Sequence, residues 1–319
     1  MSTPSLGEFE LIRRYFAEAS TDASVALGIG DDCALLIPAP DEAMAVSIDT
    51  LVEGTHFLPG TAPEHLATRL LGASISDLAA MGARPAWFTL ALTLPEATEA
   101  WLEPFATSLI ATANALNIRL VGGDTTRGPL SLSAQVHGFV PVDKALRRQG
   151  AATGDLVCVT GTLGDSRAGL ETLLNQDLQS ANVDYLQARF NAPTPRLKTG
   201  LALRGIATAC VDISDGVLAD LGHLLNNSAL GADLNIDALP LSPQLNAYAG
   251  LKQAQQWALT GGEDFELCFT CPASMQDTLA TLPEPITVIG QISAVSGIRL
   301  DGQPVSGAGG YDHFAKESS

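Results

Sequence analysis

The sequence predicts a protein of the α/β or α+β class that is built as two domains. Helical and strand-like hydrophobic patterns alternate along the chain, as they do where helices cover a sheet. A polar, glycine-bearing stretch at 143–155 interrupts this alternation, as linkers between domains do. The 319 residues suffice for two hydrophobic cores. We therefore expect an N-terminal domain over 1–143 and a C-terminal domain over 150–319.

The first half of the chain contains three helical patterns. An amphipathic pattern over 8–19 predicts the first helix. The second is expected over 63–82, because Pro63 favours a first helical turn and Gly82 favours a helix end. A third is expected over 99–116. Apolar runs predict strands at 43–48, 87–94, 118–121 and 131–140.

The second half restarts with a strand at 156–160, a turn from Gly161 and a helix from about residue 165. The turn could bind phosphate at the helix start, but we interpret it as a plain strand-to-helix connection. Another helix is expected near 215–226. Further strands are expected at 207–212, 232–236, 265–270 and 286–292.

The composition excludes several classes of function. The chain has 17 Lys and Arg against 35 Asp and Glu, a net charge of −18, and so lacks the basic surface that nucleic acids and anionic membranes need. It has no apolar run long enough to cross a bilayer and no secretory signal pattern at its start. Five cysteines, an odd number, favour a reducing, cytoplasmic environment without a disulfide framework.

Acidic residues recur beside glycine or at the ends of apolar runs. One such segment is most simply a turn, but six of them suggest functional groups presented by loops of a rigid scaffold. Two carboxylates about 4 Å apart repel by roughly 4 kcal/mol at an effective dielectric constant near 20. If these groups converge, oxygen-only ligands favour Mg²⁺ together with substrate phosphates. The residues are Asp31, Asp32, Asp49, Asp77, Asp124, Asp212, Asp215, Glu263, Asp264 and Glu266.

Asp77 stands out because it interrupts a helix that is almost uncharged from Leu70 to Ala83. Either this helix face meets water, or Asp77 projects from a core helix into a metal site. The sequence alone leaves both interpretations open.

The ordered set of motifs resembles the thiamine-monophosphate kinase family of the aminoimidazole-ribonucleotide-synthetase-like superfamily. Each motif alone is weak, but their order over nearly the whole chain is specific. They are GIGDDCA (28–34), DTLVEGTHF (49–57), SDLAAMGA (76–83), GGDTTRG (122–128), DISDG (212–216), GGEDFEL (261–267) and GYDHF (310–314).

The resemblance implies ATP-dependent phosphorylation of thiamine monophosphate to thiamine diphosphate, with several Mg²⁺ ions and ATP as co-substrate. It also implies a two-domain fold of that superfamily and a homodimer formed through the sheet of the N-terminal domain. Where the family often has threonine this chain has Ile48, whose side chain offers no oxygen. Ile48 is therefore left out of the ligand set, since any metal contact there would use its backbone carbonyl.

Carried over by position, the resemblance implies three sets of site residues. The magnesium set is Asp32, Ser47, Asp49, Asp77, Asp124, Asp212 and Asp215. The nucleotide contacts are Gly123, Asp124, Arg148 and Ser214, and the substrate contacts are His56, Glu263 and Tyr311.

The acceptor of this reaction is already a phosphate monoester and can act as its own nucleophile. Direct in-line transfer then needs positioning and charge neutralisation, but no covalent enzyme intermediate. We expect Asp32, Asp124 and Asp212 to be central to catalysis, Asp77 to join them in bridging metals, and Arg148 to bind nucleotide phosphates.

Two other functions stay open at this point. The chain could be another ATP-dependent synthetase of the superfamily, of the purine-pathway type, or a non-catalytic acidic metal-binding module. A relative that uses a reactive cysteine would need Cys33 in that role. The apolar neighbours of Cys33 lead us to expect a buried structural thiol instead.

Overall fold

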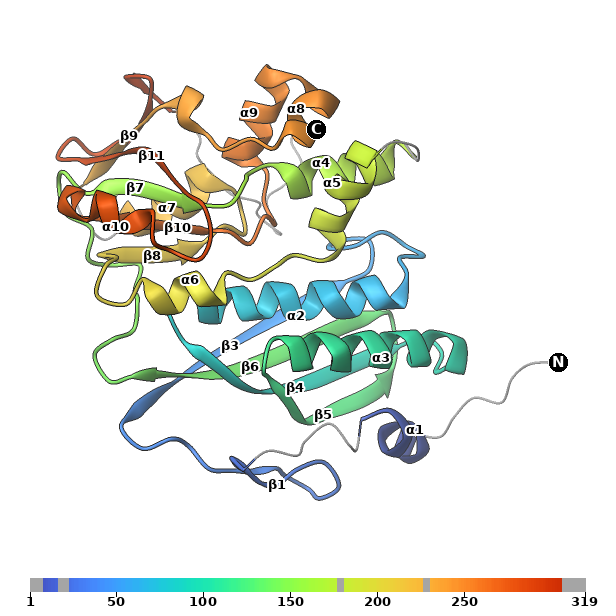
Figure 1. The fold of residues 1–319 in the computed structure, drawn as a ribbon. Coiled ribbons are helices and arrows are strands. Elements are labelled where there is room, and N and C mark those ends of the chain that lie inside the picture. Colours follow the sequence, from blue (N-terminus) through green and yellow to red (C-terminus); the bar gives the residue numbers. More distant parts are fainter. Residues whose placement is uncertain (1–7, 17–22, 177–180, 226–229, 306–319) are drawn as a thin grey trace. The chain divides into compact units, whose positions relative to one another are not determined.

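The computed structural model describes residues 8–16, 23–176, 181–225 and 230–305 (Figure 1). The chain divides into two compact units. Unit 1 comprises Met1–Leu78 and Ala83–Asp143, and unit 2 comprises Ala79–Gly82 and Lys144–Ser319. The short segment Ala79–Gly82, at the end of a helix that starts in unit 1, thus groups with unit 2.

Unit 1 is a four-stranded sheet in the order β3-β6-β4-β5. Neighbouring strands are antiparallel except β4 and β5, which are parallel. Helices α2 and α3 lie along one face of this sheet (Figure 1). The elements are α1 (Glu8–Tyr15), β1 (Val25–Leu27), β2 (Leu35–Leu36), β3 (Glu42–Val52), α2 (Pro63–Ala80), β4 (Arg84–Leu94), α3 (Glu99–Ala115), β5 (Arg119–Arg127) and β6 (Ser131–Pro141).

The other face of this sheet is only partly covered. The β1–β2 ribbon packs Val25 and Leu36 on Trp87 and Phe139. The rings of Trp87 and Phe139 meet edge to face at 5.1 Å, an arrangement that adds to the stability gained by burial alone. The ribbon therefore closes one end of the face.

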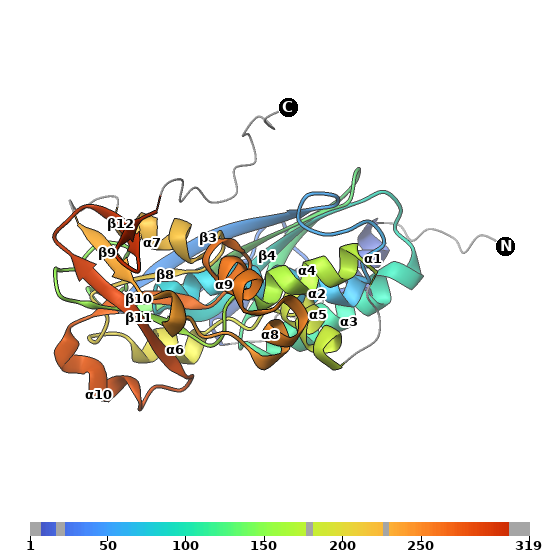
Figure 2. The same cartoon turned by 90° about the horizontal axis from the view of Figure 1, so that it is seen from above.

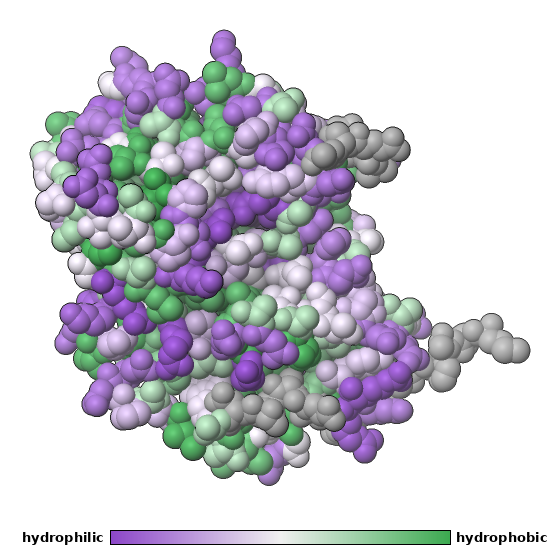
Figure 3. Space-filling model, viewed as in Figure 1, coloured by the Kyte–Doolittle hydropathy of each residue, from purple (hydrophilic) through white to green (hydrophobic). Residues whose placement is uncertain are grey.

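Strand β3 presents two different surfaces, because successive side chains of a strand point to opposite faces. Met44, Val46 and Ile48 lie on the partly covered face and are 54%, 49% and 60% exposed. Ser47 and Asp49 alternate with them and face the α2 side. In Figure 3, hydrophobic residues also reach the surface at the lower edge, where Figure 1 draws β1; Leu27, in β1, is 37% exposed.

Unit 2 is a seven-stranded sheet in the order β13-β12-β9-β11-β7-β10-β8, antiparallel except for the β9–β12 pair. Its elements are β7 (Leu156–Thr160), α4 (Asp165–Leu174), α5 (Ala181–Asn191), α6 (Leu197–Ala202), β8 (Ala209–Asp212), α7 (Val217–Leu225), β9 (Gly231–Leu234), η2 (Ile236–Ala238), α8 (Pro243–Ala249), α9 (Leu251–Thr260), β10 (Leu267–Cys271), η3 (Ala273–Met275), α10 (Gln276–Leu279), β11 (Ile286–Ser293), β12 (Gly297–Leu300) and β13 (Gln303–Pro304).

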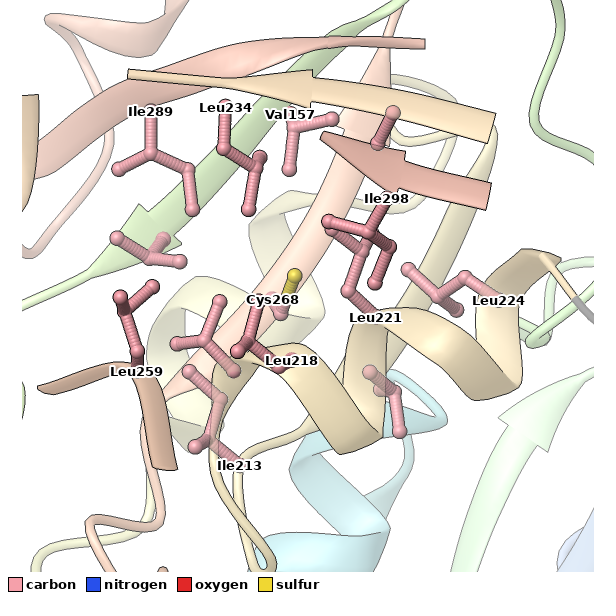
Figure 4. Packing of buried hydrophobic residues seen from close by; sticks show 14 of the residues in the cluster. Val157, Ile213, Leu218, Leu221, Leu224, Leu234, Leu259, Cys268, Ile289 and Ile298 are labelled. Carbon is pink, nitrogen blue, oxygen red and sulfur yellow. The ribbon is translucent and has the colours of Figure 1, made fainter. Parts of the chain in front are cut away.

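Both faces of the unit 2 sheet are packed. On one face, Leu218 and Leu221 of α7 pack with Cys268 and Ile289 in a large apolar cluster (Figure 4). On the other face, Cys271 belongs to a second cluster. Strands buried on both sides carry continuous apolar runs instead of alternating patterns, which is what β7, β8 and β10 show.

Helices α4, α5, α8 and α9 group together beside this sheet (Figure 2). Helix α8 starts at a strong local signal, because Ser242 accepts a hydrogen bond from the Leu245 N–H at 3.0 Å and proline occupies the next position. The four helices share a small apolar core of their own, made by Ala168, Leu186, Leu245 and Ala254.

The mixed class predicted from the sequence is confirmed. Every helix and strand expected in the sequence analysis has a counterpart, and β3, β4 and β5 are longer than predicted. The elements that were not predicted are mostly short: β1, β2, α5, α6, η2, α8, α9, η3, α10, β12 and β13. All five cysteines are free thiols, as the absence of a disulfide framework requires. Among the described residues, no helix has the length and apolar character to span a bilayer.

Candidate active site

Three of the predicted metal ligands lie together in unit 1, between β3 and α2. The Ser47 hydroxyl donates a hydrogen bond to the Asp77 carboxylate. Asp49 lies two residues further along the same face of β3, and the charge of Asp77 acts on it. Asp77 is half-buried, and its carboxylate contacts β3 through Ser47. The group offers one hydroxyl and two carboxylates, and its ligand atoms are all oxygens.

The Asp49 carboxyl has an unusual acidity. Burial, followed by the neighbouring charge of Asp77, raises its pKa to about 6, and a hydrogen bond from Ser74 partly offsets the shift. The ionised form is therefore costly in the metal-free protein. A divalent cation would relieve this cost, and hard oxygen ligands suit Mg²⁺. The donor set thus fits the ion that the family resemblance implies.

We expect Mg²⁺ binding to weaken as the pH falls through about 6, because Asp49 must lose its proton to act as a ligand. The stability of the metal-free protein depends on pH in the opposite direction. The folded pKa lies above the unfolded value of about 3.9, so the contribution of Asp49 to metal-free stability is full at low pH and is lost as the pH rises through about 6. Calorimetric Mg²⁺ titrations at pH 5.5, 6.5 and 7.5 measure the first effect.

The variant Asp49→Asn should remove most of this pH dependence together with most of the affinity. Asp143→Asn is the matched control, since Asp143 is an exposed turn residue with φ 62° that asparagine tolerates. Equal pH profiles in the wild type and Asp49→Asn would show that Asp49 is not a ligand.

His56 lies in the tight turn that follows β3. Its Nδ1 accepts a hydrogen bond from the Val52 N–H at 3.0 Å. A ring nitrogen that accepts such a bond carries no proton, so the neutral imidazole is protonated at Nε2. The structure thus fixes His56 as a donor through Nε2, which suits contact with an anionic oxygen.

A second group of predicted residues lines a cavity of about 440 Å³ in unit 1. Asp32 comes from the loop before β2, and Gly123 and Asp124 come from β5. Ile12 and Phe16 add an apolar wall. Such a mixture of apolar walls and a few polar groups is typical of small-molecule sites.

Gly123 is required by the close approach of two strands. A Cβ atom at this position would lie 2.0 Å from the backbone oxygen of Leu90 in β4. Only glycine allows β5 to pair this closely, and the pairing fixes the position of Asp124 next in the chain.

The two groups of unit 1 do not coincide. Asp124 pairs with Ala91 in a cross-strand row that continues to Ser133 and Thr50, whereas Asp49 belongs to the next row, which faces the α2 side. Asp49 and Asp124 therefore lie on opposite faces of the sheet and on its two edge strands. The Ile48 side chain points to the same face as Thr50 and away from Ser47 and Asp49, consistent with its omission from the ligand set.

In unit 2, the predicted residues lie on two loops that hydrogen-bond to each other. Asp212 ends β8 and is buried, and Ser214 and Asp215 follow it. The Ser214 backbone oxygen accepts a hydrogen bond from the Glu263 N–H at 2.8 Å. Asp212, Ser214, Asp215 and Glu263 are thus held in one local framework.

Arg148 is exposed in the segment that runs beside β8, where the Arg147 oxygen accepts a hydrogen bond from the Cys210 N–H. It thus lies in the same unit as Asp212 and Ser214. Tyr311, the remaining predicted substrate contact, lies outside the described residues.

The sequence analysis missed two residues beside Asp215. Ligand atoms of Asp215, Asp220 and His223 all lie within 4.8 Å of one another. Asp220 is buried, and its carboxylate accepts the backbone N–H groups of Ser214 and Asp215, each at 3.0 Å. Its role is to hold that loop. The sequence signal was the i, i+3 spacing of Asp220 and His223, which puts them on one face of α7, the helix that starts two residues after Asp215.

The expectation for Cys33 was wrong, because its side chain is exposed and lines the unit 1 cavity. The apolar residues after it suggested a buried strand, but β2 has only two residues and Leu35 within it is 57% exposed. A run of apolar residues at the rim of a partly covered sheet is not evidence of burial.

Comparison with known proteins gives one consistent result. Residues 30–140 match the model of the AIR synthase related protein N-terminal domain, and residues 152–303 match that of the C-terminal domain. The thiamine-monophosphate kinase of Salmonella typhimurium is 50% identical over an alignment of 320 positions, which covers 97% of this chain and 98% of the relative.

Solved structures agree with the sequence matches. The crystal structure of thiamine-monophosphate kinase from Stenotrophomonas maltophilia is 45% identical, covers 95% of this chain and 99% of its own, and superposes with a TM-score of 0.88. The structure of AaThiL complexed with AMPPCP and TMP is 32% identical, covers 97% of each chain and has a TM-score of 0.80. The chain therefore belongs to the thiamine-monophosphate kinase family of AIR-synthase-related proteins.

Proposed function

We propose that this chain transfers the γ-phosphoryl group of ATP to thiamine monophosphate, directly and with Mg²⁺, to give thiamine diphosphate and ADP. The observation that carries the metal requirement is the oxygen-only group of Ser47, Asp49 and Asp77, which the fold assembles from a strand and a helix. The complex of a family member with AMPPCP and TMP supports the two substrates.

In this reaction the main task of the protein is to position the two substrates relative to each other. An oxygen of the thiamine phosphate attacks the γ-phosphorus, and the bond from that phosphorus to the bridging oxygen of ADP breaks in line with it. The acceptor is its own nucleophile, so no side chain needs to form a covalent intermediate. Bound Mg²⁺ would supply neutralisation of the phosphate charge.

The carboxylates divide between the two units in this proposal. In unit 1 the proposed metal ligands form two separate groups, Ser47, Asp49 and Asp77 between β3 and α2, and Asp32 and Asp124 at the cavity. In unit 2 they are Asp212 and Asp215. We propose that Asp32, Asp124 and Asp212 are the most important for catalysis.

The nucleotide and the acceptor have separate contacts. Gly123 and Asp124 line the unit 1 cavity, whose apolar wall suits a planar base. Arg148 and Ser214 are proposed to contact the nucleotide from unit 2. His56, through Nε2, and Glu263 are proposed to contact thiamine phosphate, and Tyr311 is retained as a further proposed contact from the resemblance alone.

The direct test is incubation of the full chain with ATP, Mg²⁺ and thiamine phosphate, with chromatography of the products. We expect ADP and thiamine diphosphate in equal amounts, and none when EDTA is present. ADP formation only with a purine-pathway acceptor would favour the synthetase alternative. Mg²⁺ uptake without any nucleotide turnover would favour a metal-binding module.

We further propose that the reaction takes place in the cytoplasm.

We also propose that the protein is a homodimer formed through the unit 1 sheet. The supporting observation is the exposed apolar row of Met44, Val46 and Ile48 on β3, the edge strand of a partly covered face. Exposed apolar rows on an edge strand favour association with another chain. A second copy covering this face would remove these side chains from water.

Ile48→Glu is expected to convert the dimer to a monomer, because it places a charge at the most exposed position of this row. Sedimentation equilibrium measures the mass. Leu251→Glu is the matched control, since Leu251 in α9 of unit 2 is 59% exposed and should leave the dimer intact. A dimer that persists in Ile48→Glu would place the interface elsewhere.

A further inference from the structure

The segment from Gly261 to Glu266 has an unusual backbone. Glu263 has φ 67° and Phe265 has φ 50°, so two residues with side chains adopt the left-handed conformation within three positions. Such conformations are costly for residues other than glycine and persist only where the surroundings hold them. The structure must therefore contain contacts that fix this segment.

One side of the segment is held by the loop that follows β8. The Glu263 N–H donates to the Ser214 oxygen at 2.8 Å, and the Phe265 N–H donates to the Ile213 oxygen at 2.9 Å. Gly262 packs so closely that a Cβ atom would lie 2.2 Å from the Ser214 oxygen. The positions of Glu263 and Ser214 are thus linked through their backbones.

The other side is held by Asp264, which lies between the two left-handed residues. Its carboxylate accepts the Gly164 N–H at 2.6 Å and the Ser166 N–H at 3.1 Å, at the first turn of α4. Only 2% of Asp264 is exposed. Burial raises its pKa to about 7, while the Gly164 N–H and the charge of Arg189 act in the opposite direction.

This contact also assigns a role to the turn from Gly161. The free N–H groups at a helix start are a common site for phosphate, but here two of them bind a carboxylate from the same chain. The first turn of α4 therefore serves as an internal anchor for the segment at Gly261–Glu266.

We propose that Asp264 is a positioning residue for the substrate site: by binding the first turn of α4 it holds Glu263 in the orientation needed to contact thiamine phosphate. This inference rests on the proposed function, because Glu263 is a substrate contact only in that proposal. Asp264 itself is buried, and both of its carboxylate oxygens accept hydrogen bonds from the first turn of α4.

The experiment compares Asp264→Asn and Asp264→Ala with Asp165→Asn as the matched control. Asp165 is the first residue of α4 and is also buried, but its carboxylate has other partners: it accepts hydrogen bonds from the side chains of Thr162, Tyr185 and Ser242 and lies 3.7 Å from Arg189 Nε. Loss of general stability should be similar in the Asp165 and Asp264 variants, so thermal melting of each variant serves as the reference.

We expect the KM for thiamine phosphate to rise about tenfold in Asp264→Asn and further in Asp264→Ala. The KM for ATP should stay within twofold of the wild type, because the Asp220 carboxylate holds the Ser214 and Asp215 N–H groups independently of Asp264. Asp165→Asn should change neither KM by more than twofold. A rise of both KM values, or equal effects of Asp165→Asn and Asp264→Asn, would overturn the proposal and leave Asp264 a stabilising residue only.

Amide hydrogen exchange gives a readout that does not depend on the substrate. The Glu263 and Phe265 amides should exchange faster in Asp264→Asn than in Asp165→Asn, because the anchor of their segment is lost. If that exchange is faster but the wild type does not phosphorylate thiamine phosphate, the anchor stands and the proposed function fails. Unchanged exchange at both amides would refute the anchor itself.

Discussion

Asp124→Asn should lower kcat by about 100- to 1,000-fold without unfolding the protein. Loss of one group that neutralises or orients the transferring phosphate typically costs this much. Asp124 is exposed on β5, so its removal leaves no buried group unpaired. Steady-state kinetics at saturating ATP and Mg²⁺ measure the effect, and circular dichroism confirms the fold.

Asp41→Asn provides the control for Asp124→Asn. Asp41 is an exposed turn residue in the same unit with φ 61°, a conformation that asparagine adopts readily. The kcat of Asp41→Asn should match that of the wild type. Near-normal turnover of Asp124→Asn at ordinary Mg²⁺ concentrations would remove Asp124 from the catalytic set.

Glu266→Gln should lower the free energy of unfolding by about 3 kcal/mol or more, because it removes one charge from a buried ionic cluster. The Glu266 carboxylate is fully buried and accepts hydrogen bonds from Arg189 at 2.8 Å, from Arg196 Nε at 2.6 Å and from the Thr160 hydroxyl at 2.6 Å. In the variant, Arg189 and Arg196 lose the carboxylate that neutralises their charges. Urea unfolding followed by circular dichroism measures the change.

The control for Glu266→Gln is Glu171→Gln. Glu171 pairs with Arg167 one helical turn away in α4, and both side chains are partly exposed. A pair of this kind contributes about 0.5 kcal/mol or less. If the two glutamine variants unfold at the same urea concentration, the buried cluster does not contribute as the contacts indicate.

The sequence was informative where a pattern is long or a motif is local. Pro63 and Gly82 bracket α2 nearly as predicted, and the apolar run at 87–94 lies within β4. Ser47, Asp49 and Asp77 meet because residues two apart on a strand share a face and α2 covers that face. The shared face of Ser47 and Asp49 follows from the period of a strand, which the sequence records directly, whereas their contact with Asp77 also requires α2 to pack on that face.

Other relations depend on register and on distant partners. The face on which Asp124 lies follows from how β5 pairs with β4, and that pairing shifts at a bulge between Phe88 and Thr89. A single-residue shift exchanges the two faces of a strand, so no motif could reveal this. Likewise, Glu266 is clamped by Arg189 and Arg196, which lie about seventy residues earlier in the chain.

The short helices and the rim of the sheet were hardest to anticipate. Helices α8 and α9 follow each other closely across Gly250, so their patterns merge in the sequence. Cys33 and Leu35 resemble core residues in composition but lie at an uncovered edge. Burial there is decided by what the rest of the fold covers, which local composition does not encode.

Even-numbered and odd-numbered residues of β3 lie on opposite faces of the sheet. Even positions such as Val46 and Ile48 are apolar and exposed, and odd positions such as Ser47 and Asp49 direct side-chain oxygens toward α2. Insertion of one amino acid at the centre of β3 would move every later side chain of the strand to the opposite face of the sheet. The proposed metal ligands and the proposed dimer surface alternate along this one strand. Variants in which the length of β3 differs by one residue should therefore lose metal binding and dimerisation together.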